Sequence, residues 1–190
     1  MKASPASVPR QNSSEDARPL DIQRVHAAHA DFVFRSLARL GVRDDDLPDM
    51  LQEVFVVVHR RASAYDGTSK LTSWLFGICL RVAAGYRRKL QRRREQALPD
   101  ESEAALDQAH SPERAWEAAR ARAELAAVLD ELPLDKRAVF VMFEIDALSC
   151  AEIAATLGVP IGTVHSRLHA ARRSFEAVLR RRSAREDRRS

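Results

Sequence analysis

The chain has 190 residues, which is enough for one domain or two small ones. Its six glycines and eight prolines are too few for the many turns of a β-sandwich or β-barrel. No apolar run approaches the ~20 residues that cross a bilayer, and Cys79 and Cys150 fit neither a disulfide framework nor a zinc motif. The sequence therefore predicts an α-rich cytoplasmic protein without membrane insertion.

The net charge is only +4, but the charges are grouped along the chain. Residues 80–94 hold seven bases and no acid, residues 95–118 hold seven acids and one base, and residues 167–190 hold nine arginines against three acids. Two basic blocks around an acidic one indicate two surfaces that face a polyanion, joined by a linker. Solvated helix surface is the simpler explanation of the same pattern.

The first unit follows a polar tail, residues 1–20, which we expect to be disordered. Apolar periodicity predicts a helix over about residues 21–40 and a second one beginning near Asp46. A loop over residues 63–69 precedes a third helix that runs from about Lys70 into the basic block. Three helices of this kind predict a small bundle.

The second unit follows the acidic linker. One apolar helix face ends near Leu132, and helices are predicted over residues 134–146, 149–157 and 160–182. The predicted fold is therefore all-α, with two small helical domains joined by a flexible linker. In chain order the divisions are a tail (1–20), a first domain (21–95), an acidic linker (96–118), a second domain (119–182) and a basic tail (183–190).

The last two helices have the pattern of a helix-turn-helix. Ser149 and Glu152 form a capping box at the start of the first, and Gly158 suits the left-handed turn at its end. Polar and basic residues share the outer face of the second: Thr163, His165, Ser166, Arg167, His169, Arg172 and Arg173. Such a face predicts a helix that reads duplex DNA, whereas a plain helical hairpin is the alternative.

His165 and His169 are four residues apart, as two metal ligands on a helix would be. No glutamate follows His165 as in zinc proteases, and no nearby acid or cysteine supplies a third ligand. We therefore expect no metal site and no cofactor.

The first unit carries a polar stripe and an aromatic-basic segment. Asp49, Gln52 and Glu53 share one face of the second helix and can dock on a basic partner helix, although a solvated face explains them too. Aromatic and cationic side chains suit unstacked bases and their phosphates, although Trp74 also fits the core. The residues concerned are Tyr65, Lys70, Trp74, Arg81, Arg87 and Arg88.

Five segments in order resemble bacterial RNA polymerase sigma factors. They are Asp49–Phe55, Leu71–Ile78, Leu132–Pro133, Leu148–Ala154 and Gly162–Leu168. The short chain without a middle domain resembles the extracytoplasmic function (ECF) group. The resemblance extends over about residues 21–182.

The resemblance implies a transcription initiation factor that is not an enzyme. Residues 21–95 would be sigma region 2 and residues 119–182 sigma region 4. The β′ clamp helices of core polymerase would bind Asp49, Gln52, Glu53 and Phe55. The aromatic-basic residues would recognise and melt the minus-ten element, and the outer face of the last helix would read the minus-thirty-five element. The linker would enter the RNA channel, the second unit would meet the β flap, and an anti-sigma protein is a further partner that the family allows.

Two other functions remain open at this stage. An autonomous helix-turn-helix regulator would bind duplex DNA alone, but would leave the acidic stripe and the Trp74 segment without a role. A nucleic-acid enzyme such as a nuclease would need a cluster of carboxylates or histidines that holds a metal, and the acids here lie in the linker or on an exposed face.

Overall fold

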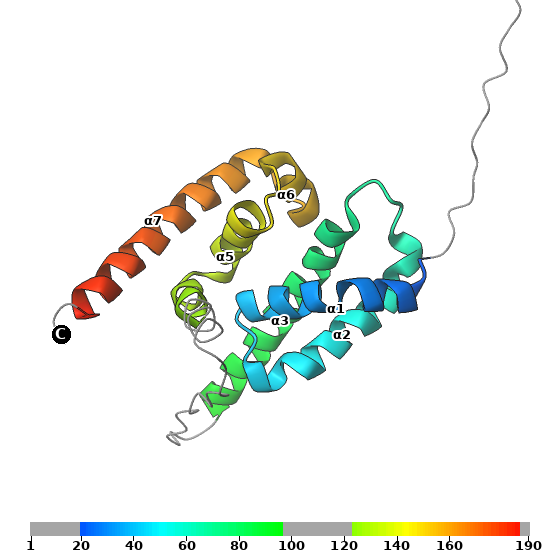
Figure 1. Ribbon diagram of the computed structural model, residues 1–190, viewed down its shortest axis with the longest axis horizontal. Helices are drawn as coiled ribbons and strands as arrows, with labels where there is room; N and C mark the ends of the chain where they lie inside the picture. The colour runs from blue at the N-terminus through cyan, green and yellow to red at the C-terminus, as the bar shows by residue number, and fades with distance from the viewer. Residues whose placement is uncertain (1–19, 97–122, 187–190) are drawn as a thin grey trace, which may run out of the picture.

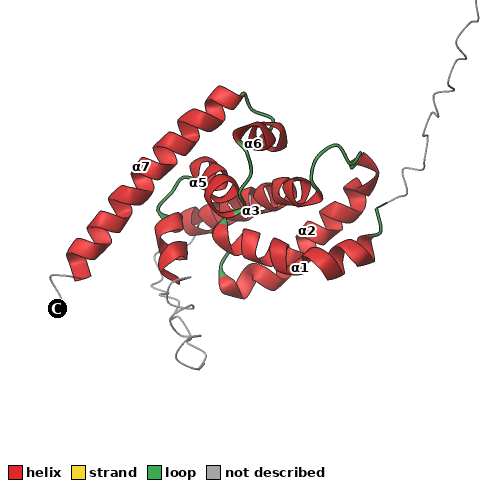
Figure 2. Cartoon of the chain, turned by 45° about the horizontal axis from the view of Figure 1, so that its top comes forward, coloured by secondary structure: helices red, strands yellow, loops and turns green. Residues whose placement is uncertain are grey.

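The computed structural model describes residues 20–96 and 123–186, and all regular structure in these ranges is helical (Figures 1 and 2). Most of the two predicted tails and of the predicted linker lies outside these ranges. The first domain contains α1 (Ile22–Arg39), η1 (Asp44–Asp46), α2 (Leu47–Arg61), η2 (Ala62–Ala64) and α3 (Leu71–Gln96). The second contains a helix over residues 123–130, then α5 (Leu134–Phe140), η3 (Val141–Ile145), α6 (Cys150–Leu157) and α7 (Ile161–Glu186). The predicted all-α, two-domain fold is confirmed.

The first domain is a three-helix bundle in which α1, α2 and α3 contact one another pairwise. The side chain of Asp21 caps α1 by accepting from the Arg24 amide at 3.2 Å, and Pro48 lies in the first turn of α2. The bundle centre is made of fully buried side chains, among them Val33, Leu37 and Phe76. Helix α1 thus spans the predicted range to within one residue at each end, and α2 and α3 begin within one residue of the predicted places.

The second domain departs from the prediction after α5. The sequence predicts one helix over residues 134–146, but the α-helix ends at Phe140 and continues as the π-helix η3. Ala147 then takes a left-handed φ of 54°, and the Leu148 amide donates to the Met142 carbonyl at 2.9 Å. This tight exit turns the chain toward α6. At the other end of the domain α7 extends to Glu186, four residues beyond the predicted Arg182.

The two domains pack against each other. Helix α6 contacts α3, and buried residues of both domains form one continuous apolar cluster. Arg137 of α5 is fully buried, where its Nη1 donates to Asp130 Oδ1 at 2.7 Å. Burial lowers the pKa of Arg137, and the attraction of Asp130 partly offsets this lowering.

Candidate nucleic-acid interface

The acidic stripe predicted on α2 is exposed. Asp49, Gln52 and Glu53 all face solvent, and Val56 on the same helix is 48% exposed. Phe55 does not share this face: it is 8% exposed and its ring centroid lies 4.4 Å from that of His26. Phe55 therefore packs into the bundle and can act on a partner only by fixing the position of α2.

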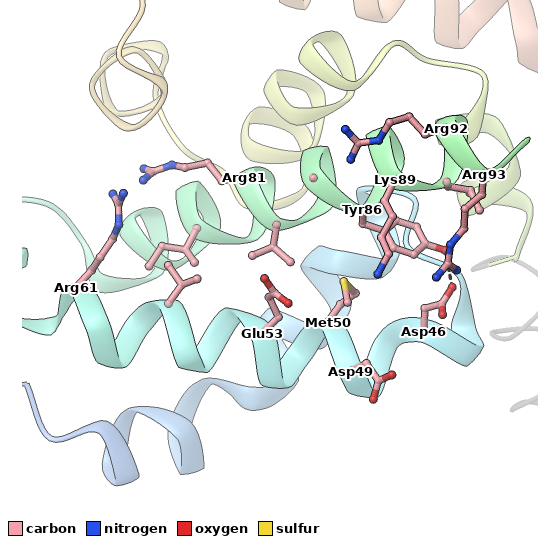
Figure 3. A pocket seen from close by; sticks show the side chains of 15 residues that line it. Asp46, Asp49, Met50, Glu53, Arg61, Arg81, Tyr86, Lys89, Arg92 and Arg93 are labelled. Carbon is pink, nitrogen blue, oxygen red and sulfur yellow. Dashed lines mark hydrogen bonds between the residues drawn. The ribbon is translucent and has the colours of Figure 1, made fainter. Parts of the chain in front are cut away.

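A groove of about 740 Å³ separates the acidic side of α2 from the basic side of α3 (Figure 3). Asp46, Asp49 and Glu53 line it from the α2 side, and Lys89 and other bases line it from α3. The Tyr86 hydroxyl donates to Asp46 Oδ2 at 2.6 Å, and burial together with this bond raises the pKa of Tyr86. One wall can thus attract a cationic partner and the other a polyanion.

Arg61 is a groove residue that the sequence analysis missed. It lies at the end of α2, and its guanidinium and that of Arg81 on α3 point toward one another (Figure 3). Glu53, Val57 and Arg61 are four residues apart, so they share one helix face. Following the helix face of Glu53 for two further turns along the sequence would have identified Arg61.

The loop before α3 is held in one shape. The Tyr65 and Trp74 ring centroids are 5.2 Å apart, and the Tyr65 hydroxyl donates to the Ser69 carbonyl at 2.8 Å. Asp66 Oδ1 accepts from the amide and the hydroxyl of Thr68 at 3.0 and 2.7 Å, and these bonds lower the pKa of Asp66. An aromatic pair on a fixed loop suits stacking with an unpaired base.

A single face of α3 brings together most of the predicted minus-ten residues. Lys70, Trp74, Arg81 and Arg88 follow one another at spacings of four or seven residues, so they form a stripe, here called the α3 stripe. Arg87 is turned away from it. A Cβ placed on Gly41 would lie 3.1 Å from Arg87 Nη1, which puts this guanidinium beside the end of α1.

The helix-turn-helix forms as predicted. The Ser149 side chain accepts from the Glu152 amide, while Glu152 Oε2 accepts from the Ser149 amide at 2.8 Å. Gly158 ends α6 with a φ of 65°, and Val164 and Leu168 bury the inner face of α7. The capping box and the left-handed glycine fix where α7 begins relative to α6.

The predicted reading face of α7 divides into two groups. His165, Ser166, His169 and Arg173 are exposed, with Thr163 partly covered. Arg167 and Arg172 instead pair with acids of the same domain: Arg167 Nε lies 3.3 Å from Asp135 Oδ2, and Arg172 Nε lies 2.6 Å from Glu144 Oε1. The Arg172 guanidinium also lies 5.0 Å from the centre of the Phe143 ring. These two arginines tie α7 to the domain as well as facing outward.

Within residues 20–96 and 123–186, no three His, Cys, Asp or Glu side chains gather in a way that could hold a metal ion. The helices of these same ranges include none long and apolar enough to cross a membrane.

Comparison with known proteins supports both domains. Residues 25–93 match the family described as Sigma-70 region 2, and residues 122–175 match Sigma-70, region 4. The chain is 37% identical over 157 residues to the ECF RNA polymerase sigma factor SigE of Mycolicibacterium smegmatis, covering 82% of this chain and 60% of that protein. It is 32% identical over 148 residues to the ECF RNA polymerase sigma-E factor of Escherichia coli, covering 74% of this chain and 78% of that protein.

Solved structures agree with this result. The sigma factor RpoE of Bartonella quintana, in complex with the anti-sigma factor NepR, has a similar fold, with a TM-score of 0.64, 20% identity, and coverage of 84% of this chain and 97% of that chain. CnrH, in complex with the cytosolic domain of CnrY, matches with a TM-score of 0.59 and 25% identity, over 83% of this chain and 86% of that one. The chain therefore belongs to the ECF RNA polymerase sigma factors.

Proposed function

We propose that the protein binds core RNA polymerase in the cytoplasm, directs it to specific promoters and opens the promoter DNA, without being an enzyme itself. One observation carries this proposal: the chain contains both sigma regions, in the order of the family. Region 2 has an exposed acidic helix face, and region 4 has a helix with an exposed polar and basic face. The chain spans 60% of the M. smegmatis relative and 78% of the E. coli relative.

Core polymerase would dock on α2. The exposed carboxylates of Asp49 and Glu53, with the Gln52 amide between them, offer acceptors to basic side chains of the β′ clamp helices. Phe55 supports this face from the buried side of the same helix.

The minus-ten element would be read by the α3 stripe and the loop before it. The Tyr65–Trp74 pair offers a stacking surface for a base of the opened strand, while Lys70, Arg81 and Arg88 neutralise its phosphates. Arg87 lies off this stripe, so its part in DNA binding would be an electrostatic one. Arg61 joins the cationic side of the groove.

The minus-thirty-five element would be read by α7. The exposed His165, Ser166 and His169, together with Thr163, would contact base edges in the major groove. The flanking arginines would bind phosphates, and these are Arg167, Arg172 and Arg173. The acidic linker would occupy the RNA channel, region 4 would meet the β flap, and an anti-sigma protein would be a further partner.

The autonomous regulator is the less favoured function. It gives no role to the exposed acids of α2 or to the fixed Tyr65–Trp74 loop, and it does not account for the region 2 match.

A capture experiment with core polymerase tests the docking face. Asp49→Ala/Glu53→Ala should reduce capture of the core enzyme at least tenfold, because both acceptors are lost while the buried side of α2 is untouched. Asp31→Ala/Glu176→Ala is the matched control, since it removes two exposed acids outside α2 and changes the net charge equally.

Transcription from total genomic DNA provides the second readout. The wild type should add specific RNA start sites to those of the core enzyme, and the α2 variant should not. Undiminished capture by the α2 variant would remove the docking role, and a wild type that starts no RNA would remove the proposed function.

A further inference from the structure

One end of the groove between α2 and α3 carries two arginines that face each other. Arg61 is the last residue of α2 and Arg81 lies on α3, and their guanidinium groups point toward one another (Figure 3). Both side chains are exposed, so a ligand can reach them from solvent. The groove residues about one turn before them, Val57 and Ile78, are uncharged. We refer to Arg61 and Arg81 as the arginine pair.

The Arg81 side chain runs back along α3 toward the start of that helix. A Cβ placed on Gly77, one turn earlier, would lie 3.6 Å from Arg81 Nη2. Side chains of an α-helix lean toward its N-terminus, so this direction is the ordinary one. The missing side chain at Gly77 leaves space for the guanidinium on the side of α3 that faces Arg61.

Neither member of the arginine pair has an acidic partner within residues 20–96 and 123–186. The ion pairs of these ranges engage other cations, such as Lys70 with Glu152 at 2.8 Å. Two positive charges that face each other repel, and an anion bound between them would replace this repulsion by attraction. Guanidinium groups bind phosphate oxygens through two parallel N–H bonds, which makes a phosphate the anion that fits best.

The rest of the groove does not offer a second phosphate site. Glu53 lies eight residues before Arg61 on α2, which is about 12 Å along the helix, and Asp49 lies one turn further. Bases of α3 such as Lys89 line the opposite wall, so the charges of this half largely offset each other. Only the end with the arginine pair is uniformly positive.

The arginine pair lies close to the surface proposed to hold an unpaired base. Trp74 is seven residues before Arg81, or about 10.5 Å along α3. Tyr65, whose ring centroid is 5.2 Å from that of Trp74, follows Arg61 by four residues. The backbone beside a base stacked on these two rings can therefore reach both guanidinium groups.

We propose that the arginine pair binds a single phosphate of the opened minus-ten strand, next to the base that stacks on Tyr65 and Trp74. This proposal rests on the function proposed above. Fixing the base and its neighbouring phosphate on one domain keeps that base out of the stack of the strand. Arg61 is thus a DNA-binding residue of α2, the helix whose acidic face was assigned to core polymerase.

The salt dependence of binding distinguishes one shared phosphate from two separate ones. Each phosphate neutralised on a single strand contributes about −0.7 to the slope of log affinity against log salt concentration. For a fluorescent mixed-sequence single-stranded DNA, Arg61→Ala/Arg81→Ala should therefore reduce the magnitude of this slope by about 0.7. Two independent phosphate contacts would instead reduce it by about 1.4.

The single variants complete a double-mutant cycle. Arg61→Ala and Arg81→Ala should each weaken single-strand binding about fivefold, and the double variant about tenfold rather than about 25-fold, because the first loss already breaks the shared site. Arg24→Ala/Arg60→Ala is the matched control, since it removes two exposed arginines that do not line the groove. The control should weaken binding less than Arg61→Ala alone.

Trp74 fluorescence reports whether the base is held in place. Trp116→Phe leaves Trp74 as the only tryptophan of the chain. In this background a saturating single strand should quench Trp74, and Arg61→Ala should reduce the quenching at saturation by at least half. A residue that only attracts DNA would lower the affinity without changing the quenching at saturation.

Three results would overturn the shared phosphate site: a slope that changes by about 1.4, affinity losses that multiply, or unchanged quenching at saturation. These measurements need no polymerase. If they behave as expected but the protein directs no RNA start with core polymerase, then the phosphate site stands and the proposed function fails. If RNA is started but Arg61→Ala/Arg81→Ala binds single strands like the wild type, then the function stands and the phosphate site fails.

Discussion

Gly41 shows how one residue can serve local and distant structure together. It follows α1 with a φ of 88°, a conformation that side chains with a Cβ adopt at a cost. A Cβ at this position would also collide with Nη1 of the buried Arg137 and lie 3.1 Å from Asp130 Oδ1. The first role is visible in the sequence, because a glycine at the end of a helix is a common signal. The second role, leaving room for Arg137 and Asp130, depends on the other domain and is not visible in the sequence.

Comparison of two glycines separates these roles. Gly158 has a similar φ of 65°, but a Cβ there would meet no atom within 4 Å. Gly158→Ala should cost about 1 kcal/mol of unfolding free energy, the ordinary penalty of the left-handed region. Gly41→Ala should cost about 3 kcal/mol, because the buried guanidinium must also move. Urea unfolding measures the loss of unfolding free energy in both variants. Equal losses would show that the Arg137 side chain moves aside without strain.

Helix α6 is an element whose ends are fixed by few residues. It has eight residues, a capping box at its start and a left-handed glycine at its end. Glu152 is part of the capping box and also pairs with Lys70, and hydrogen bonds from Lys70 and Ser149 lower the pKa of Glu152 to about 2. The start of this helix therefore depends on an ionised carboxylate.

The lowered pKa gives α6 a defined pH dependence. A carboxylate with a folded-state pKa near 2 and an unfolded value of 4.5 binds more protons when the protein is unfolded. Its stabilising contribution is therefore complete above pH 4.5 and is lost as the pH falls toward 2. Thermal melts should show a lower Tm for Glu152→Gln than for the wild type at pH 6, and a shrinking difference below pH 4.5. Glu176→Gln is the control, and a difference that stays constant with pH would contradict the assignment.

At the scale of the whole molecule, the two family domains share one buried core. Buried residues from α1, α3, α5, α6 and α7 belong to the same apolar cluster. An apolar surface shared between domains couples their unfolding, because opening one exposes the surface of the other.

Calorimetry tests this coupling. The wild type should unfold in one transition, since both domains lose the shared surface together. Asp146 Oδ1 lies 3.3 Å from Arg39 Nη1 of the first domain, and Asp146→Arg replaces this attraction between the domains by repulsion. The variant should produce two transitions, or one with a clearly reduced ratio of van't Hoff to calorimetric enthalpy, because its domains no longer support each other. Two resolved transitions in the wild type would show that the domains are thermodynamically independent.

Local signals in the sequence were sufficient to predict where most of the helices begin and end. Asp21, Ser149 and Gly158 mark helix ends through bonds or backbone angles that involve only neighbouring residues, so they could be recognised without a structure. The exposed face of α7 follows in the same way from the spacing of Val164 and Leu168 on its buried side. The π-helix η3 could not be predicted, because it arises where the chain must turn from the end of α5 toward α6.

What the sequence determined by itself was the set of helices, their division into two domains and the faces that carry charge, because helical periodicity and caps are short-range properties. Only the tertiary structure decided which partners these side chains meet within the folded chain. It turned Arg87 toward Gly41, buried Phe55 against His26 and set Glu152 on Lys70. These contacts join residues far apart in the chain, and no local pattern encodes which partner a charged or aromatic side chain will meet.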